Sequence, residues 1–197
     1  TTEIPLDAES PLMRGLKALH DQLTLQRFRQ LTEVDTVHYL QPFVDVVTSQ
    51  DTSGPITGAA LSSLHKFLLY GFISPHSSPR AAAGVNLIAW GISQCVFEET
   101  DQYGDEVVLM KLLELSALCL RCEVGALLLQ ERIWQIFSKC LAVSSETGRG
   151  RGHSSLLRST ADNTMAHIVL VVFSRARNDS ARRQAPLGIP TTAQSES

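Results

Sequence analysis

Apolar residues recur at intervals of three and four along most of this chain, a spacing typical of the buried face of an α-helix. The pattern predicts about seven helices, and few segments alternate apolar and polar residues in the manner of a β-strand. Glycine and proline fall mostly between the apolar blocks, where they suit turns. The predicted helices cover residues 11–30, 36–47, 55–73, 80–96, 105–121, 124–143 and 154–173.

Residues that favour helix ends mark several of these boundaries. Pro55 fits the first position of the third helix, where a backbone N–H is not needed. Asp35 or Thr36 is predicted to cap the second helix. Pro42 is expected in the first turns of that helix, because a missing N–H is tolerated there.

The order of the helices predicts a layered all-α fold. Short loops favour antiparallel neighbours, and the helix at 105–121 is apolar on most sides, which places it at the centre of the domain. The sixth helical segment, expected to break near Leu129, turns Ile133, Trp134 and Phe137 inward. We expect an armadillo- or HEAT-like stack of about seven helices, with a plain helical bundle as the alternative.

Composition divides the chain into three parts. Residues 1–10 are a loose lead-in, and residues 11–175 hold the helical domain. Residues 176–197 contain Pro, Ser, Thr, Gln and Gly with few apolar side chains, so they are expected to form a flexible linker or tail.

The third helix has two apolar rows. At about 100° per residue, one broad arc forms the predicted core face. It contains Ile56, Ala60, Leu64, Phe67, Leu68 and Phe72. The second row contains Ser62, Lys66, Leu69 and Ile73. Either a neighbouring helix of the same chain covers this second row, or another chain does.

The fifth helix offers only a narrow polar strip, made of Glu106, Glu114 and Arg121. This strip is where an otherwise buried helix meets water or a partner. A contact between Lys66 and Glu106, within one chain or across two, is therefore a hypothesis; the alternative is two solvated charges that contribute little.

Charge and hydropathy exclude several classes of function. The formal net charge is −3, and basic residues do not alternate with aromatics along one face, so no nucleic-acid surface is predicted. No apolar run is long enough to span a membrane, and no secretory signal is visible. The first residue is Thr1, so the sequence is interpreted as a fragment or a processed piece.

No pattern typical of catalysis or metal binding is present, so neither a catalytic residue nor a cofactor or metal is predicted. Cys119 and Cys122 form a Cys-x-x-Cys pair, but no further ligands stand at zinc spacing. The four cysteines are therefore interpreted as small core residues of a reduced, cytosolic protein. Two alternatives remain: a small hydrolase or redox protein that uses this pair with a histidine, and a membrane-surface binder that uses the basic residues between Arg175 and Arg183.

Two long stretches resemble a known family. Residues 39–61 read YLQPFVDVVTSQDTSGPITGAAL, and residues 100–113 read TDQYGDEVVLMKLL. Both are similar to motifs of the dimerisation and cyclophilin-binding (DCB) domain of large Arf guanine-nucleotide exchange factors, in the Golgi branch that includes GNOM and the brefeldin-resistance factors. The resemblance covers residues 11–140 well and 153–173 loosely. The glycine-rich stretch at 148–152 and Glu123 depart from the family pattern.

The resemblance implies an all-helical, non-catalytic regulatory domain that acts in Golgi vesicle trafficking. Its implied partners are a second copy of itself and the homology-upstream domain that follows, with cyclophilin and Golgi trafficking proteins as further partners. It also implies that Lys66 and Glu106 support dimerisation, that the chain alone lacks exchange activity, and that the full-length protein is cytoplasmic and peripheral on early Golgi membranes. The alternative is a helical-repeat adaptor that binds another protein without self-association.

Overall fold

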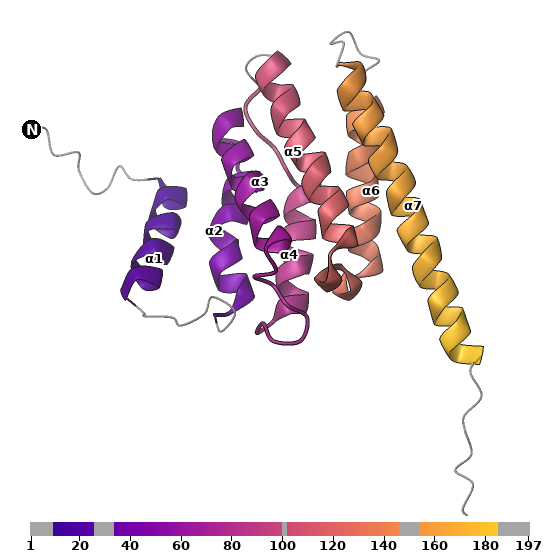
Figure 1. The fold of residues 1–197 in the computed structure, drawn as a ribbon. Helices are drawn as coiled ribbons and strands as arrows, with labels where there is room; N and C mark the ends of the chain where they lie inside the picture. The colour runs from indigo at the N-terminus through magenta and orange to yellow at the C-terminus, as the bar shows by residue number, and fades with distance from the viewer. Residues whose placement is uncertain (1–9, 26–33, 100–101, 146–153, 185–197) are drawn as a thin grey trace, which may run out of the picture.

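The computed structural model describes residues 10–25, 34–99, 102–145 and 154–184. Within these ranges the chain forms seven α-helices and one short 3₁₀ helix, which confirms the predicted all-α class (Figure 1). The elements are α1 (Pro11–Leu25), α2 (Thr36–Thr48), α3 (Gly54–Leu69), α4 (Ala81–Ser93), α5 (Gln102–Arg121), η3 (Glu123–Leu127), α6 (Gln130–Ser145) and α7 (Ser155–Gln184).

The helices from α2 onward form two layers. In one layer α3 packs on α5 and α5 packs on α7, and in the other α2 packs on α4 and α4 packs on α6. Successive helices α2 and α3, α4 and α5, and α6 and α7 pair across the layers. This is the arrangement of stacked helix pairs in an α-solenoid, so the predicted helical stack is confirmed. Helix α1 packs on α2 at the edge of the stack (Figure 1).

Glycines let the helices within each layer approach closely. A Cβ added to Gly84 of α4 would overlap Cγ2 of Thr36, and one on Gly91 would lie 3.1 Å from Cγ1 of Val44. In the other layer, a Cβ on Gly58 of α3 would lie 3.3 Å from Nζ of Lys111. Side chains at Gly84 and Gly91 would push α2 and α4 apart, whereas at Gly58 the flexible end of Lys111 would have to move aside.

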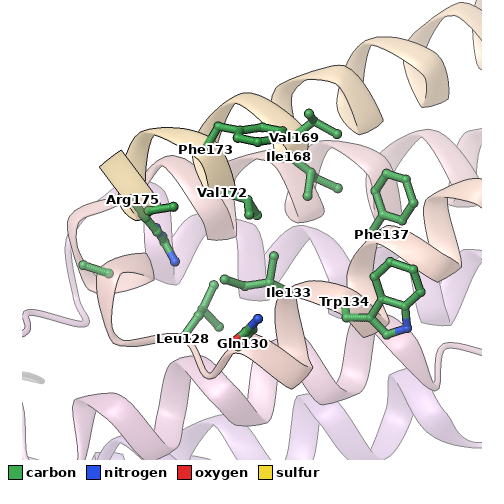
Figure 2. Close-up of a pocket in the computed structure, with 12 residues that line it drawn as sticks. Leu128, Gln130, Ile133, Trp134, Phe137, Ile168, Val169, Val172, Phe173 and Arg175 are labelled. Carbon is green, nitrogen blue, oxygen red and sulfur yellow. The ribbon is translucent and has the colours of Figure 1, made fainter. Parts of the chain in front are cut away.

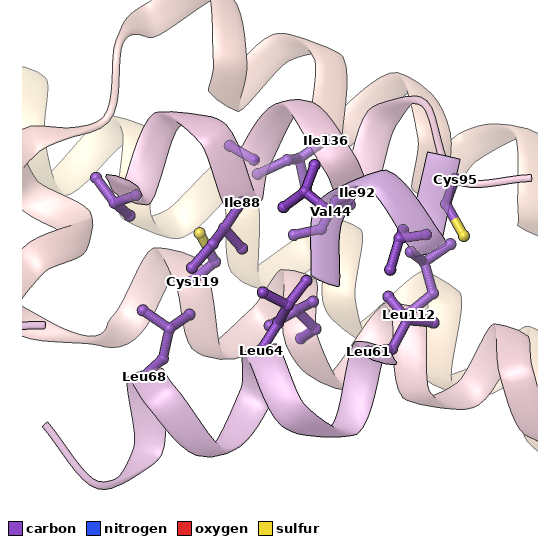
Figure 3. Packing of buried hydrophobic residues seen from close by; sticks show 14 of the residues in the cluster. Val44, Leu61, Leu64, Leu68, Ile88, Ile92, Cys95, Leu112, Cys119 and Ile136 are labelled. Carbon is purple, nitrogen blue, oxygen red and sulfur yellow. The ribbon is translucent and has the colours of Figure 1, made fainter. Parts of the chain in front are cut away.

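Helix α5 is central, as predicted from its apolar faces. It packs between α3 and α7 and also contacts α4, α6 and η3. Leu112, Leu113, Leu115 and Cys119 of α5 are fully or almost fully buried. They belong to one continuous core with Leu61 and Leu64 of α3, Ile88 and Ile92 of α4 and Ile136 of α6 (Figure 3).

Helix α2 begins where the sequence indicates, but its proline lies elsewhere. Asp35 is the N-cap, and its Oδ1 accepts a hydrogen bond from the N–H of Val37 at 2.9 Å. Pro42 stands in the middle of the helix, not in its first turns as expected. The helix tolerates it because the bond that Pro42 cannot donate would end on the carbonyl of His38, and that residue is exposed to water.

Helix α3 ends four residues earlier than predicted. Gly71 has a φ of +68°, which only glycine adopts readily, and it turns the chain out of the helix. The N–H of Phe72 donates to the carbonyl of Phe67 at 3.1 Å, and the N–H of Gly71 donates to that of Leu68 at 3.2 Å. These two bonds form a Schellman motif. Residues beyond Gly71 therefore do not continue the faces of α3.

Helix α7 is longer than predicted. It continues to Gln184, so the expected tail at 176–197 is helical over its first nine residues. Residues 176–184 contain alanine, arginine and glutamine, which favour helices, and the first proline after them is Pro186. Figure 1 shows this part of α7 running past the ends of the neighbouring helices. The remainder of the predicted tail, the lead-in at 1–9 and the glycine-rich stretch at 148–152 lie outside the described residues.

Substitution of Gly84 tests the close packing of α2 on α4. We expect Gly84→Ala to lower the free energy of unfolding by about 1–3 kcal/mol, because the new methyl group overlaps the fully buried Thr36. Urea denaturation followed by circular dichroism measures the change. Gly15→Ala is the matched control: its Cβ would lie 3.9 Å from Cβ of Pro42, an ordinary contact, so stability should stay equal or rise by up to about 1 kcal/mol. Equal stability of Gly84→Ala and wild type would contradict the packing described.

Candidate protein-interaction site

Helix α3 carries three of the six predicted interaction residues. Lys66 is exposed, and the side chain of Leu69 is 54% exposed. Ser62 is partly buried, and its Oγ donates to the carbonyl of Gly58 one turn earlier at 2.8 Å. On the neighbouring α5, Glu114 is exposed as well. Within this set, Lys66, Leu69 and Glu114 are therefore accessible to a partner, whereas the hydroxyl of Ser62 already donates its hydrogen bond within α3.

Ile73 does not belong to this surface, contrary to the prediction. It is only 4% exposed, because the chain leaves the helix at Gly71 and turns Ile73 into the core. The predicted core face of α3 is also partly wrong. Ala60, Leu64 and Leu68 are buried as expected, but Ile56 and Phe72 are exposed.

The exposed residues at the C-terminal end of α3 and in the turn that follows form one candidate surface, called here the α3 surface. Tyr70 follows the last helical residue and is 67% exposed. Its ring packs edge-on against Phe72 with 6.4 Å between centroids. Sequence periodicity placed Phe72 in the core and did not single out Tyr70, because both residues lie at the turn where the helical spacing ends. The α3 surface comprises Lys66, Leu69, Tyr70 and Phe72. Ile56 is exposed as well, but it lies near the other end of α3 and about 140° around the helix from Leu69, so it is not part of this surface.

Lys66 and Glu106 do not meet within the chain. Helices α3 and α5 run in the same direction, since Gly54 lies beside Val108 and Gly58 lies beside Lys111. Lys66 is near the C-terminal end of α3 and Glu106 is near the N-terminal end of α5, about 20 Å apart along the helix axes at 1.5 Å per residue. The within-chain form of the hypothesis is therefore wrong, and a contact between two chains stays a prediction.

Glu106 instead contacts the start of α7. Its Oε1 accepts a hydrogen bond from the N–H of Ser154 at 2.7 Å, and the Oγ of Ser154 accepts one from the N–H of Leu157 at 3.2 Å. Ser154 thus caps α7 while a carboxylate of α5 holds Ser154. Negative charge at a helix N-terminus is also favoured by the helix dipole.

A second candidate surface is an apolar groove between α6 and α7, with a volume of about 520 Å³ (Figure 2). Trp134 was predicted to face inward, but it is 66% exposed at this groove and stacks on Phe137 with 5.7 Å between ring centroids. Phe173 of α7 is 71% exposed. The groove is lined by Ala126, Leu128, Gln130, Ile133, Trp134, Phe137, Ile168, Val169, Val172, Phe173, Arg175 and Ala176.

Arg175 ties the far part of α7 to the end of α5. Its Nη2 donates to the carbonyl of Gly125 at 2.8 Å and to that of Leu120 at 3.4 Å. These carbonyls lie where α5 passes into η3, so the positive charge stands at a helix C-terminus, where it is stabilising. The first arginine of the proposed basic membrane cluster therefore already has partners within the fold.

The cysteines lie in the core, as predicted. Cys95, Cys119 and Cys140 are buried, Cys122 is partly buried, and none of the four is in a disulfide. Burial raises the pKa of the Cys95 and Cys140 thiols to about 11 and raises the pKa of Cys119 and Cys122 as well. Reactive cysteines need a lowered pKa, so these thiols are unsuited to nucleophilic or redox chemistry at neutral pH.

The described part of the chain contains no group of three or more His, Cys, Asp or Glu residues that could hold a metal ion. None of its helices is long and apolar enough to cross a membrane.

Comparison with known proteins identifies the family. The chain is 34% identical, over 176 residues, to the Golgi-specific brefeldin A-resistance guanine nucleotide exchange factor 1 homolog of Caenorhabditis elegans. It is 32% identical over 166 residues to the Arf guanine-nucleotide exchange factor GNOM of Arabidopsis thaliana. The chain belongs, as one segment, to the family of Golgi- and GNOM-type Arf guanine-nucleotide exchange factors.

The match covers nearly all of this chain but little of the relatives. It includes 88% of the chain and 9% of the nematode protein, and 84% of the chain and 11% of GNOM. The Arf guanine-nucleotide exchange factor 2 of Saccharomyces cerevisiae is 29% identical over 85% of the chain and 11% of its own length. The segment corresponds to the N-terminal region of these large exchange factors. No protein-family model matches the chain.

Thiol labelling tests the buried state of the cysteines. At pH 8 we expect the partly buried Cys122 to react first, and Cys95, Cys119 and Cys140 to react much more slowly. With a pKa of about 11, roughly one thiol in a thousand is ionised at pH 8, so labelling of Cys95 and Cys140 should accelerate as the pH rises towards 11. Mass spectrometry after timed labelling identifies the sites, and labelling in urea is the control, where all four should react. Rapid labelling of Cys119 in the folded protein would contradict this assignment.

Proposed function

We propose that this chain is the DCB domain of a large Arf exchange factor and acts as a non-catalytic regulatory and self-association module. The observation that carries the proposal is the match of more than four-fifths of the chain to about a tenth of each relative. A segment of that size is one domain of a much larger protein. The whole protein would activate Arf in Golgi vesicle traffic and act in the cytoplasm and at early Golgi membranes.

The α3 surface supports a role in protein contact. Exposed aromatic side chains are enriched in protein interfaces, and charged side chains belong to the polar rim around them. Leu69 and Tyr70 are each more than half exposed, and Lys66 lies on the same helix. We assign self-association to this surface, with Glu114 on the adjacent α5 as a candidate acidic group. Cyclophilin and Golgi trafficking proteins are further candidate partners.

The α6–α7 groove supports a contact with the part of the protein that follows. Terminal repeats of a solenoid need a polar outer face, or another repeat must cover them. Here the last pair of described helices exposes Trp134, Phe173 and Val169. We propose that the following homology-upstream domain stacks on this groove.

Molar mass tests self-association. We expect the wild-type chain to have about twice its 21.6 kDa mass in size-exclusion chromatography with light scattering. Lys66→Ala should shift the mass towards that of a monomer, because it removes a charge and a long side chain from the proposed interface, and truncating a hot-spot residue costs about 2 kcal/mol or more. Circular dichroism should show an unchanged helix content, since Lys66 is exposed.

Controls separate this proposal from its alternatives. Lys17→Ala, on the exposed side of α1, should leave the mass of the chain unchanged. A monomeric wild type would favour an adaptor that binds another protein without self-association. A double variant, Lys66→Ala with Glu106→Ala, that stayed dimeric would place self-association on another surface.

Hydrogen exchange tests the groove. In the longer protein that includes the following domain, we expect amides of 168–173 to exchange more slowly than in this chain alone. Trp134→Ala in the longer protein should abolish that added protection, whereas Ser138→Ala on the same helix should keep it. Equal exchange in the chain and in the longer protein would place the following domain on another surface.

A further inference from the structure

The hydrogen bond between Glu106 and Ser154 gives this glutamate a structural role within the chain, because it joins α5 to the start of α7. Glu106 belongs to the second turn of α5, and its Oε1 lies 2.7 Å from the backbone nitrogen of Ser154. That N–H precedes the first residue of α7, so the bond fixes where the helix begins. Leu157, in the first turn of α7, is fully buried, and its N–H donates to the Oγ of Ser154.

The opposite part of α7 is anchored on the same helix. Arg175 donates to the carbonyl of Leu120 near the end of α5, and to that of Gly125 in η3. Between the two anchors, one face of α7 is buried at Leu157, Ala161, Thr164 and Ile168. These residues recur at steps of four, three and four, so they form a single stripe along the helix. Glu106 and Arg175 therefore set the position of this stripe on α5 from its two ends.

We propose that Glu106 is a positioning residue that seats α7 on α5, and that it affects self-association only through α7. The seating of α7 by Glu106 holds whether or not the chain dimerises. The effect of Glu106 on self-association rests on the proposed function. Lys66 and Glu106 then have different roles: Lys66 lies on the α3 surface, and Glu106 maintains the last helix of the stack.

The test compares Glu106→Ala with Glu106→Gln. Glutamine keeps a carbonyl oxygen at the position of Oε1, so it can still accept the bond from Ser154, whereas alanine cannot. We expect Glu106→Ala to speed amide hydrogen exchange at Ser154 and in the first turn of α7 by about tenfold, the effect of losing a hydrogen bond to a charged acceptor. Glu106→Gln should keep exchange within about threefold of wild type. Glu131→Ala, which removes an exposed carboxylate of α6, is the matched control and should leave these amides unchanged.

Molar mass is measured on the same variants. If wild type self-associates, Glu106→Gln should keep the molar mass of the wild type. Glu106→Ala should shift towards the mass of a monomer only if the amides at the start of α7 also lose their protection from hydrogen exchange. Unchanged exchange at Ser154 in Glu106→Ala would overturn the positioning role. A monomeric Glu106→Gln with protected Ser154 would show instead that the charge of Glu106 acts at the interface. If wild type is a monomer, the proposed function fails, and the exchange rates still decide the role of Glu106.

Discussion

The close parallel packing of α3 on α5 is the constraint on which the other features depend. Gly54 and Gly58 bring α3 onto Val108 and Lys111, and Nζ of Lys111 donates to the carbonyl of Gly58 at 3.3 Å. This contact fixes the direction and register of α5, and α5 in turn supports α7. It also determines which side of α3 remains open. The exposure of the α3 surface and the position of α7 on α5 therefore both follow from the contact between α3 and α5.

The two candidate surfaces lie in different parts of the stack. The α3 surface belongs to the pair α2 and α3, whereas the groove lies between α6 and α7. Helices α4 and α5 separate them with a core that is almost fully buried (Figure 3). A partner on one surface therefore leaves the other open. A domain with this layout has room for two partners at once, and coupling between them would have to pass through the central pair of helices.

Periodicity predicted the helices well because each has a continuous apolar face, and the cap at Asp35 follows from its side chain. Tertiary contacts decided the rest. Gly71 stops α3 before Ile73 by a backbone bond pattern that a helical wheel ignores. Trp134 is as apolar as a core residue, and only the absence of a helix over it in the described chain leaves it exposed. The partner of Glu106 is 48 residues away in sequence, so no local pattern could indicate it.

The exposure of Trp134 also gives the molecule an optical property. The chain has two tryptophans, and the other, Trp90, is partly buried in α4 and packs against the core. Indole emission shifts to longer wavelength in water, so the two side chains should emit at different wavelengths. The redder component would come from the groove between α6 and α7. Binding of a partner in that groove would therefore shift the wavelength of the tryptophan emission, whereas binding at the α3 surface would leave it unchanged.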